Sequence, residues 1–202
     1  NKKYLLPLLG FAISMGAAVN LFLYLSVSTS NILAPIVIGA QLSIPIAIIF
    51  SSLFIGESVS LNKWILIITS FLGIVLIGFD PKIADEILGF LLICCMAFFY
   101  ASSQVFSRYL KELDVKFNNA FMGLIGFVIL LIFSIFFEGN TIENLKNLNI
   151  NAWLLALHHG VLCSLMGHMS MFYLYRFYPV GQVLPFYALF PVFGLILTFL
   201  IF

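Results

Sequence analysis

The chain has 202 residues, of which 63% are hydrophobic and only 8% are charged, and its formal net charge is +1. Soluble domains carry about 25% charged residues, so this composition excludes an ordinary soluble fold and indicates an integral membrane protein. The small net charge also argues against a nucleic acid partner.

The charged residues divide the chain into apolar stretches. From Tyr4 to Gly56 there is no Asp, Glu, Lys or Arg. A membrane-spanning helix needs about 20 apolar residues, so this stretch holds two spans with a turn at Ser26–Asn31. Only helices satisfy every backbone polar group in lipid at this length. The alternation at period two that a transmembrane β-barrel would require is absent from the sequence. The predicted fold is therefore an all-α integral membrane bundle with seven transmembrane helices: Leu5–Leu25, Ile32–Ile55, Trp64–Phe79, Ile87–Phe106, Phe117–Phe137, Ala152–Tyr175 and Val180–Phe202.

Polar residues inside the first two spans mark candidate substrate-binding positions. Asn20 and Tyr24 share one helix face because they lie four residues apart. Pro45 has no N–H to pair with the carbonyl of Gln41, so Gln41 presents an amide side chain and an unpaired acceptor on the same face. We interpret this notch as a binding site for a zwitterion. The alternative is a structural kink sealed by a neighbouring helix.

Later spans hold similar positions. Gln104 belongs to a polar stripe in the fourth span, and His168 lies deep in the sixth. His168 either binds a carboxylate or relays a proton, or it stays neutral and hydrogen-bonded. Tyr187 and Pro191 in the seventh span have the same four-residue spacing as Gln41 and Pro45.

Nothing in the sequence indicates catalysis or a resident metal. The three cysteines lie in apolar runs without a CxxC pair, which is typical of small buried hydrophobic residues. The spacing of His158 and His159 relative to His168 does not match the i, i+3 or i, i+4 pattern of metal ligands on a helix. We expect no enzyme activity, no metal and no cofactor.

The basic residues predict an orientation in the membrane. With the loops numbered alternately, Lys82 and Lys146 lie on one side. The positive-inside rule then places the N-terminus in the cytoplasm and the polar loop at 138–151 outside. The cytoplasmic side holds seven basic residues: Lys2, Lys3, Lys63, Arg108, Lys111, Lys116 and Arg176.

Two parts of the chain have similar layouts. Residues 22–45 and residues 172–191 each run from an aromatic helix end, through a short turn, into a helix with two prolines. The first turn is uncharged and the second holds Arg176, so the two turns are expected on opposite sides of the membrane. This is the property of an inverted repeat whose two-fold axis lies in the membrane plane.

Residues 38–81, IGAQLSIPIAIIFSSLFIGESVSLNKWILIITSFLGIVLIGFDP, resemble the end of an EamA-type repeat of the drug/metabolite transporter superfamily. Residues 175–199, YRFYPVGQVLPFYALFPVFGLILTF, resemble the matching part of the second repeat. The pattern is closest to that of the amino-acid metabolite exporters. In this resemblance Gly56 and Glu57 are a structural signature, and we expect Glu57 to be hydrated or paired with Lys63.

The resemblance implies ten helices in two inverted five-helix repeats. This chain would hold spans three to nine, with residues 1–80 in the first repeat and 87–202 in the second, and would be truncated at both ends. It implies a multi-pass protein of a bacterial plasma (inner) membrane that exports an amino acid or related small polar metabolite by alternating access. Its partners would be the lipid bilayer and this substrate, and a homodimer is compatible with the sequence.

Other functions remain open at this point. One is a transporter for another substrate, such as a nucleoside derivative or a vitamin. Another is a truncated membrane bundle that transports nothing and serves as a scaffold.

The orientation can be tested by labelling. We expect single cysteines placed in the 138–151 loop to react with a membrane-impermeant thiol reagent in whole cells, because this loop is predicted to be external. Cysteines at 111–116 should react only after the cells are opened. The opposite pattern would reverse the orientation.

Overall fold

The computed structural model describes residues 2–78, 86–139 and 141–190, together with residues 193, 196, 199 and 200. The described residues form helices and turns, with no β-strand among them. Five helical stretches are long and apolar enough to cross a membrane. These are Lys3–Thr29, Pro35–Ile55, Ile87–Tyr109, Val115–Phe137 and Ile150–Leu174. The prediction of an all-α membrane protein is confirmed for this part of the chain.

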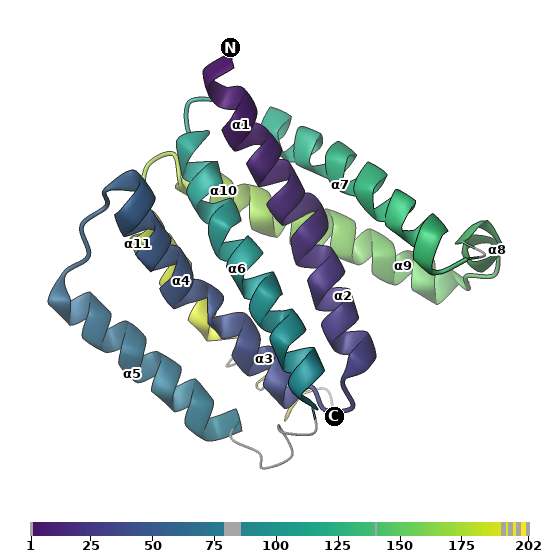
Figure 1. Cartoon of the computed structure of the whole chain (residues 1–202), viewed down its shortest axis with the longest axis horizontal. Coiled ribbons are helices and arrows are strands. Elements are labelled where there is room, and N and C mark those ends of the chain that lie inside the picture. Colours follow the sequence, from purple (N-terminus) through teal and green to yellow (C-terminus); the bar gives the residue numbers. More distant parts are fainter. Residues whose placement is uncertain are drawn as a thin grey trace.

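The first half contains the elements up to residue 78 (Figure 1). One long helix is formed by α1 (Lys2–Phe11), the π-helical segment η1 (Ala12–Ala18) and α2 (Val19–Thr29). The next consists of α3 (Ala34–Gln41), α4 (Ser43–Phe50) and the π-helical η2 (Ser51–Ile55), and α5 (Leu61–Gly78) follows.

The second half begins with α6 (Ile87–Tyr109) and α7 (Val115–Phe137), followed by the short α8 (Thr141–Lys146). A long helix then combines α9 (Ile150–His158), the π-helical η4 (His159–His168) and α10 (Met169–Leu174). The last described elements are α11 (Val180–Val183) and the 3₁₀ segment η5 (Leu184–Leu189).

Two of the seven predicted spans are not among the five long helical stretches. The third, Trp64–Phe79, coincides with α5, which ends at Gly78. The seventh, Val180–Phe202, is described as an apolar helix only over Val180–Leu189, and most of the rest falls outside the described residues.

The turn predicted at Ser26–Asn31 is mostly helical, because α2 continues to Thr29. The hydroxyls of Ser28 and Thr29 donate to the carbonyl of Leu25 at 3.0 and 2.7 Å. These bonds satisfy the polar side chains inside the helix, so the serines and threonine do not end it. The observed turn lies at residues 30–33.

Helix α6 is the centre of the bundle. It lies between α3–α4 and α1–α2, with α5 on the outer side of α3 and α4, and α7 and α9 on the opposite side (Figure 1). Small residues such as Ala97 and Ala101 are fully buried on it, and they let neighbouring helices approach closely. The same face buries Ile93 and Tyr100 in the main apolar cluster.

The turn before α3 and the turn before α11 contact opposite ends of α6. At its start, the backbone N–H of Asn31 donates to both carboxylate oxygens of Glu86 at 3.1 Å, and the Asn31 side chain donates at 3.0 Å. At its far end, Arg108 donates to the backbone carbonyl of Tyr175. The turn before α3 and the turn before α11 therefore lie at opposite ends of the bundle.

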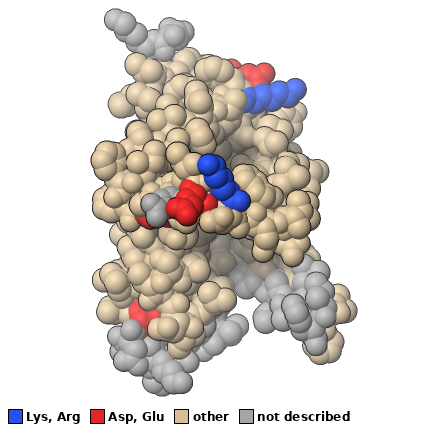
Figure 2. All heavy atoms as spheres, turned by 90° about the vertical axis from the view of Figure 1, so that its right-hand side faces the viewer, with Lys and Arg blue, Asp and Glu red and all other residues tan. Residues whose placement is uncertain are grey.

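The outer surface is apolar. In Figure 2 most of the visible face consists of uncharged residues, and the charged side chains gather in a few spots. Large apolar side chains such as Leu124, Phe127 and Ile132 of α7 are half or more exposed. A surface of this kind is stable in lipid rather than water.

Helix α7 packs against η1 through two glycines. A Cβ atom on Gly16 would lie 2.5 Å from the carbonyl oxygen of Met122, and one on Gly126 would collide with the backbone of Gly16. The two backbones are therefore in direct contact, which is the usual way that small residues join membrane helices.

Replacement of Gly126 by alanine is expected to destabilise this contact. Overpacking costs about 1–3 kcal/mol, so Gly126→Ala should lower the melting temperature of the purified full-length protein in detergent. Gly123→Ala is the matched control, because nothing lies within 4 Å of a Cβ at that position. Equal melting temperatures for the two variants would contradict the close packing.

Candidate functional site

The Gln41–Pro45 notch exists as a break between two helices. α3 ends at Gln41 and α4 begins at Ser43. The N–H of Leu42 turns back to the carbonyl of Gly39 at 3.1 Å, which tightens the last turn of α3. Pro45 has no N–H, so the α-helical bond to the carbonyl of Gln41 cannot form. The interruption follows directly from this one residue.

This break borders a cavity of about 340 Å³. Its walls come from α3–α4, from α5 and from the α11–η5 segment, so both proline-bearing helices contribute. Ligand cavities in proteins typically measure about 300–1,000 Å³, so this one suits a small molecule. The lining residues are Gln41, Ile44, Pro45, Lys63, Ile67, Phe71, Gly181, Gln182, Pro185 and Ala188.

A second group of candidate residues meets around Tyr100, beside this cavity. The Tyr100 ring lies 5.9 Å from the Tyr187 ring and 6.5 Å from the His168 ring, centroid to centroid. The same segment η5 supplies Tyr187 to this cluster and Pro185 and Ala188 to the cavity wall. The structure thus brings His168 and Tyr187 to the same side chain, that of Tyr100 on α6, which is far from both in the sequence.

Gln104 lies on the same helix as Tyr100, one turn later. Its side chain is fully buried, and its amide nitrogen donates to the carbonyl of Tyr100 at 3.1 Å and to the hydroxyl of Ser103 at 3.0 Å. Its amide oxygen has no partner among the described atoms. Gln104 is therefore held by its own helix and keeps one unused acceptor.

Asn20 and Tyr24 do not line the cavity. The Asn20 amide donates to the carbonyls of Met15 and Gly16 at 3.2 and 3.1 Å. It thereby satisfies acceptors at the π-helical segment of its own helix. Tyr24 is 58% exposed. The predicted site residue Pro191 lies outside the described residues.

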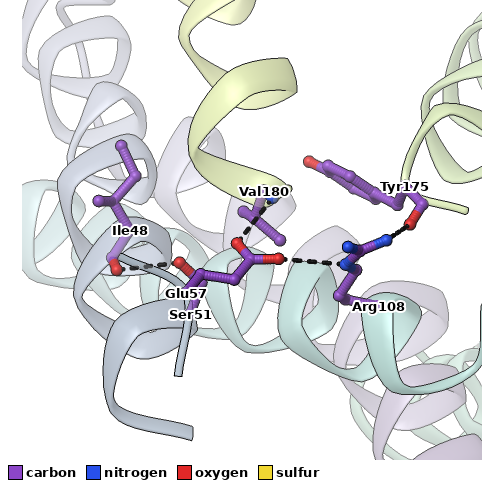
Figure 3. Close-up of polar contacts among 6 residues, drawn as sticks. All are labelled: Ile48, Ser51, Glu57, Arg108, Tyr175 and Val180. Atoms are coloured by element: carbon purple, nitrogen blue, oxygen red, sulfur yellow. Dashed lines mark hydrogen bonds and ion pairs between the residues drawn. The ribbon is translucent and has the colours of Figure 1, made fainter. Parts of the chain in front are cut away.

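Glu57 connects three elements (Figure 3). Its carboxylate accepts from the Arg108 guanidinium at 3.1 Å and from the backbone N–H of Val180, the first residue of α11, at 2.9 Å. Only 16% of the Arg108 side chain and 11% of the Glu57 side chain are exposed, so the pair is shielded from solvent. The expectation that water or Lys63 would pair with Glu57 is corrected: its partners are Arg108 and the start of α11.

Gly56 makes this contact possible. Its φ of 78° lies in the left-handed region, where glycine is favoured because it has no Cβ. The helix therefore ends there, and the chain turns Glu57 toward α6 and α11. The signature pair thus has a structural basis in the fold.

Sequence reasoning did not find Lys63 and Gln182 as cavity residues, or Arg108 as the partner of Glu57. A signal for Gln182 was present, because it precedes Pro185 by three residues as Gln41 precedes Pro45 by four. No comparable signal linked Arg108 to Glu57, since 51 residues separate them.

Together, the apolar helices and the cavity between them define a multi-pass membrane protein with a cavity large enough for a small molecule. Residues 87–202 match the EamA-like transporter family. Because this match covers more than half of the 202 residues, the chain belongs to the EamA-like transporter family. Its members are membrane transporters of the drug/metabolite type rather than enzymes. No curated protein and no solved structure matches the chain significantly.

The Glu57–Arg108 pair can be tested with a double-mutant cycle. Removing one partner of a buried ion pair costs about 3–5 kcal/mol. We expect Glu57→Gln and Arg108→Gln each to lower the melting temperature by roughly 6–12 °C, taking the lower end of that cost and about 2–4 °C per kcal/mol. The melting temperature of the double variant should fall by less than the sum of the two single decreases. Glu143→Gln, at an exposed position in α8, should have little effect. Additive losses in the cycle would mean that the pair contributes no coupling.

Proposed function

We propose that this chain is the part of a transporter that binds and moves a small polar metabolite, an amino acid or a related compound, in the direction of export. The observation that carries the proposal is the cavity between the two proline-bearing helices. It combines the amides of Gln41 and Gln182 with an apolar wall, which is the usual composition of a specific small-molecule site. Membership of the EamA-like transporter family supports the same function.

The proposed mechanism is alternating access between two inverted repeats, residues 1–80 and 87–202, which would hold spans three to nine of ten. Two features support the repeat. The turns before α3 and α11 lie at opposite ends of α6. The helices that precede these turns each contain a π-helical segment, η1 and η4. Inverted repeats place the substrate between them at the level of broken helices.

Within this proposal, Gln41 and Pro45 bind substrate at the cavity. Tyr187 and His168 lie beside it in the cluster around Tyr100, and Gln104 donates a hydrogen bond to the backbone carbonyl of Tyr100. Asn20, Tyr24 and Pro191 remain candidates for contacts in another state of the transport cycle. The location we propose is the plasma membrane of a bacterium, with the N-terminus of this chain in the cytoplasm.

The decisive test is Gln41→Leu in the full-length protein. No hydrogen bond of the Gln41 side chain is found within the described part of the chain, so leucine should leave the melting temperature nearly unchanged. A lost hydrogen bond to a charged group is worth about 1.5–3 kcal/mol, or roughly a 10- to 100-fold loss of affinity. Uptake of the transported metabolite into inverted membrane vesicles should therefore fall at concentrations below saturation.

Thr69→Val provides the matched control. Thr69 lies on α5, and its hydroxyl is satisfied by the carbonyl of Ile65 at 2.8 Å; it does not line the cavity. Normal uptake by Gln41→Leu together with a lowered melting temperature would show that Gln41 only joins helices. If the full-length protein transports no solute, this result would favour the alternative that it serves as a scaffold.

A further inference from the structure

Lys63 gives the cavity a positive charge. It lies near the start of α5, is half-buried, and lines the cavity together with Gln41 and Gln182. Within the described residues, no carboxylate lies at ion-pair distance from its ammonium group. Glu57, the acid nearest in sequence, is already held by Arg108 and by the N–H of Val180. As far as the structure describes the chain, the cavity therefore has a lysine without a partner acid.

The other groups in the cavity complement this charge. The amides of Gln41 and Gln182 come from different proline-bearing helices and supply both hydrogen-bond donors and acceptors. Ile44, Ile67 and Phe71 form the apolar part of the wall. The cavity thus offers one cationic group, two neutral polar groups and an apolar surface.

We propose that Lys63 determines the specificity of this site by binding the carboxylate of a small amphipathic acid. The apolar body of the acid would contact Ile67 and Phe71, and the two glutamine amides would bind its remaining polar groups. A single ammonium group suits a monoanion, and the cavity volume of about 340 Å³ suits a molecule the size of one amino acid. This inference rests on the proposed function and names the class of its substrate.

Binding of three matched probes to the purified full-length protein tests the proposal. L-leucine and isocaproate carry the carboxylate, whereas L-leucinamide has the same apolar body without it. We expect both acids to bind and raise the melting temperature, and L-leucinamide to bind about 10-fold more weakly or worse, because charge-assisted hydrogen bonds are the stronger ones. Inorganic phosphate and vesicles of phosphatidylglycerol serve as competitors that carry a phosphate instead.

Variants assign the effect to Lys63. Lys63→Met should abolish the preference for the acids over L-leucinamide, and Lys63→Arg should retain most of it. The melting temperatures of the unliganded variants show that the fold is intact. Lys111→Met removes an exposed lysine that does not line the cavity, so its preference should match that of the unchanged protein.

The inference would be overturned by equal binding of L-leucine and L-leucinamide, by no binding of either acid, or by an unchanged preference in Lys63→Met. Displacement of the acids by phosphate or phosphatidylglycerol would also overturn it, because the site would then bind a phosphate. The proposed function has its own test. If Gln41→Leu loses uptake while Lys63→Met keeps the acid preference, the transport site stands and only the role of Lys63 fails.

Discussion

The carboxylate of Glu57 fixes the relative positions of three helices that the sequence places far apart. It joins the end of η2 to Arg108 on α6 and to the first N–H of α11. α11 and the segment that follows it form one wall of the cavity, and α4, which leads into η2, forms another. The distance between these two walls therefore depends on the hydrogen bond from Val180 to Glu57, and on the shielded Glu57–Arg108 ion pair that holds this carboxylate. Such a pair is stabilising only while both partners are present.

Much of the fold follows from the positions of the charged residues in the sequence. The five long helices match five predicted spans because lipid penalises charged groups, and the protein keeps them at the ends of helices. The end of α2 was not predictable in this way. Ser28 and Thr29 look like turn residues in a sequence, but their hydroxyls are satisfied by the carbonyl of Leu25 and the helix continues.

The site was only partly predictable, for a related reason. A polar side chain in a membrane helix needs a hydrogen-bond partner, and a sequence does not show whether that partner is a substrate or the same helix. Asn20 and Gln104 bind carbonyls of their own helices, whereas Gln41 lines a cavity. Pro45 distinguished Gln41 from the others, because its missing N–H creates a break whatever the surroundings are. The pairing of Glu57 with Arg108 depends on tertiary structure, so no local pattern contains it.

Glu57 binds α11 through a backbone N–H and not through a side chain. Every amino acid except proline supplies this group. The side chain at position 180 is fully buried and is therefore constrained by packing rather than by this contact. Proline is the residue that the contact forbids. The same holds for the N–H of Asn31 at Glu86, although the Asn31 side chain adds a bond of its own there. An evolving chain can thus change the residue that begins α11, or the residue in the turn before α3, while it retains these backbone contacts.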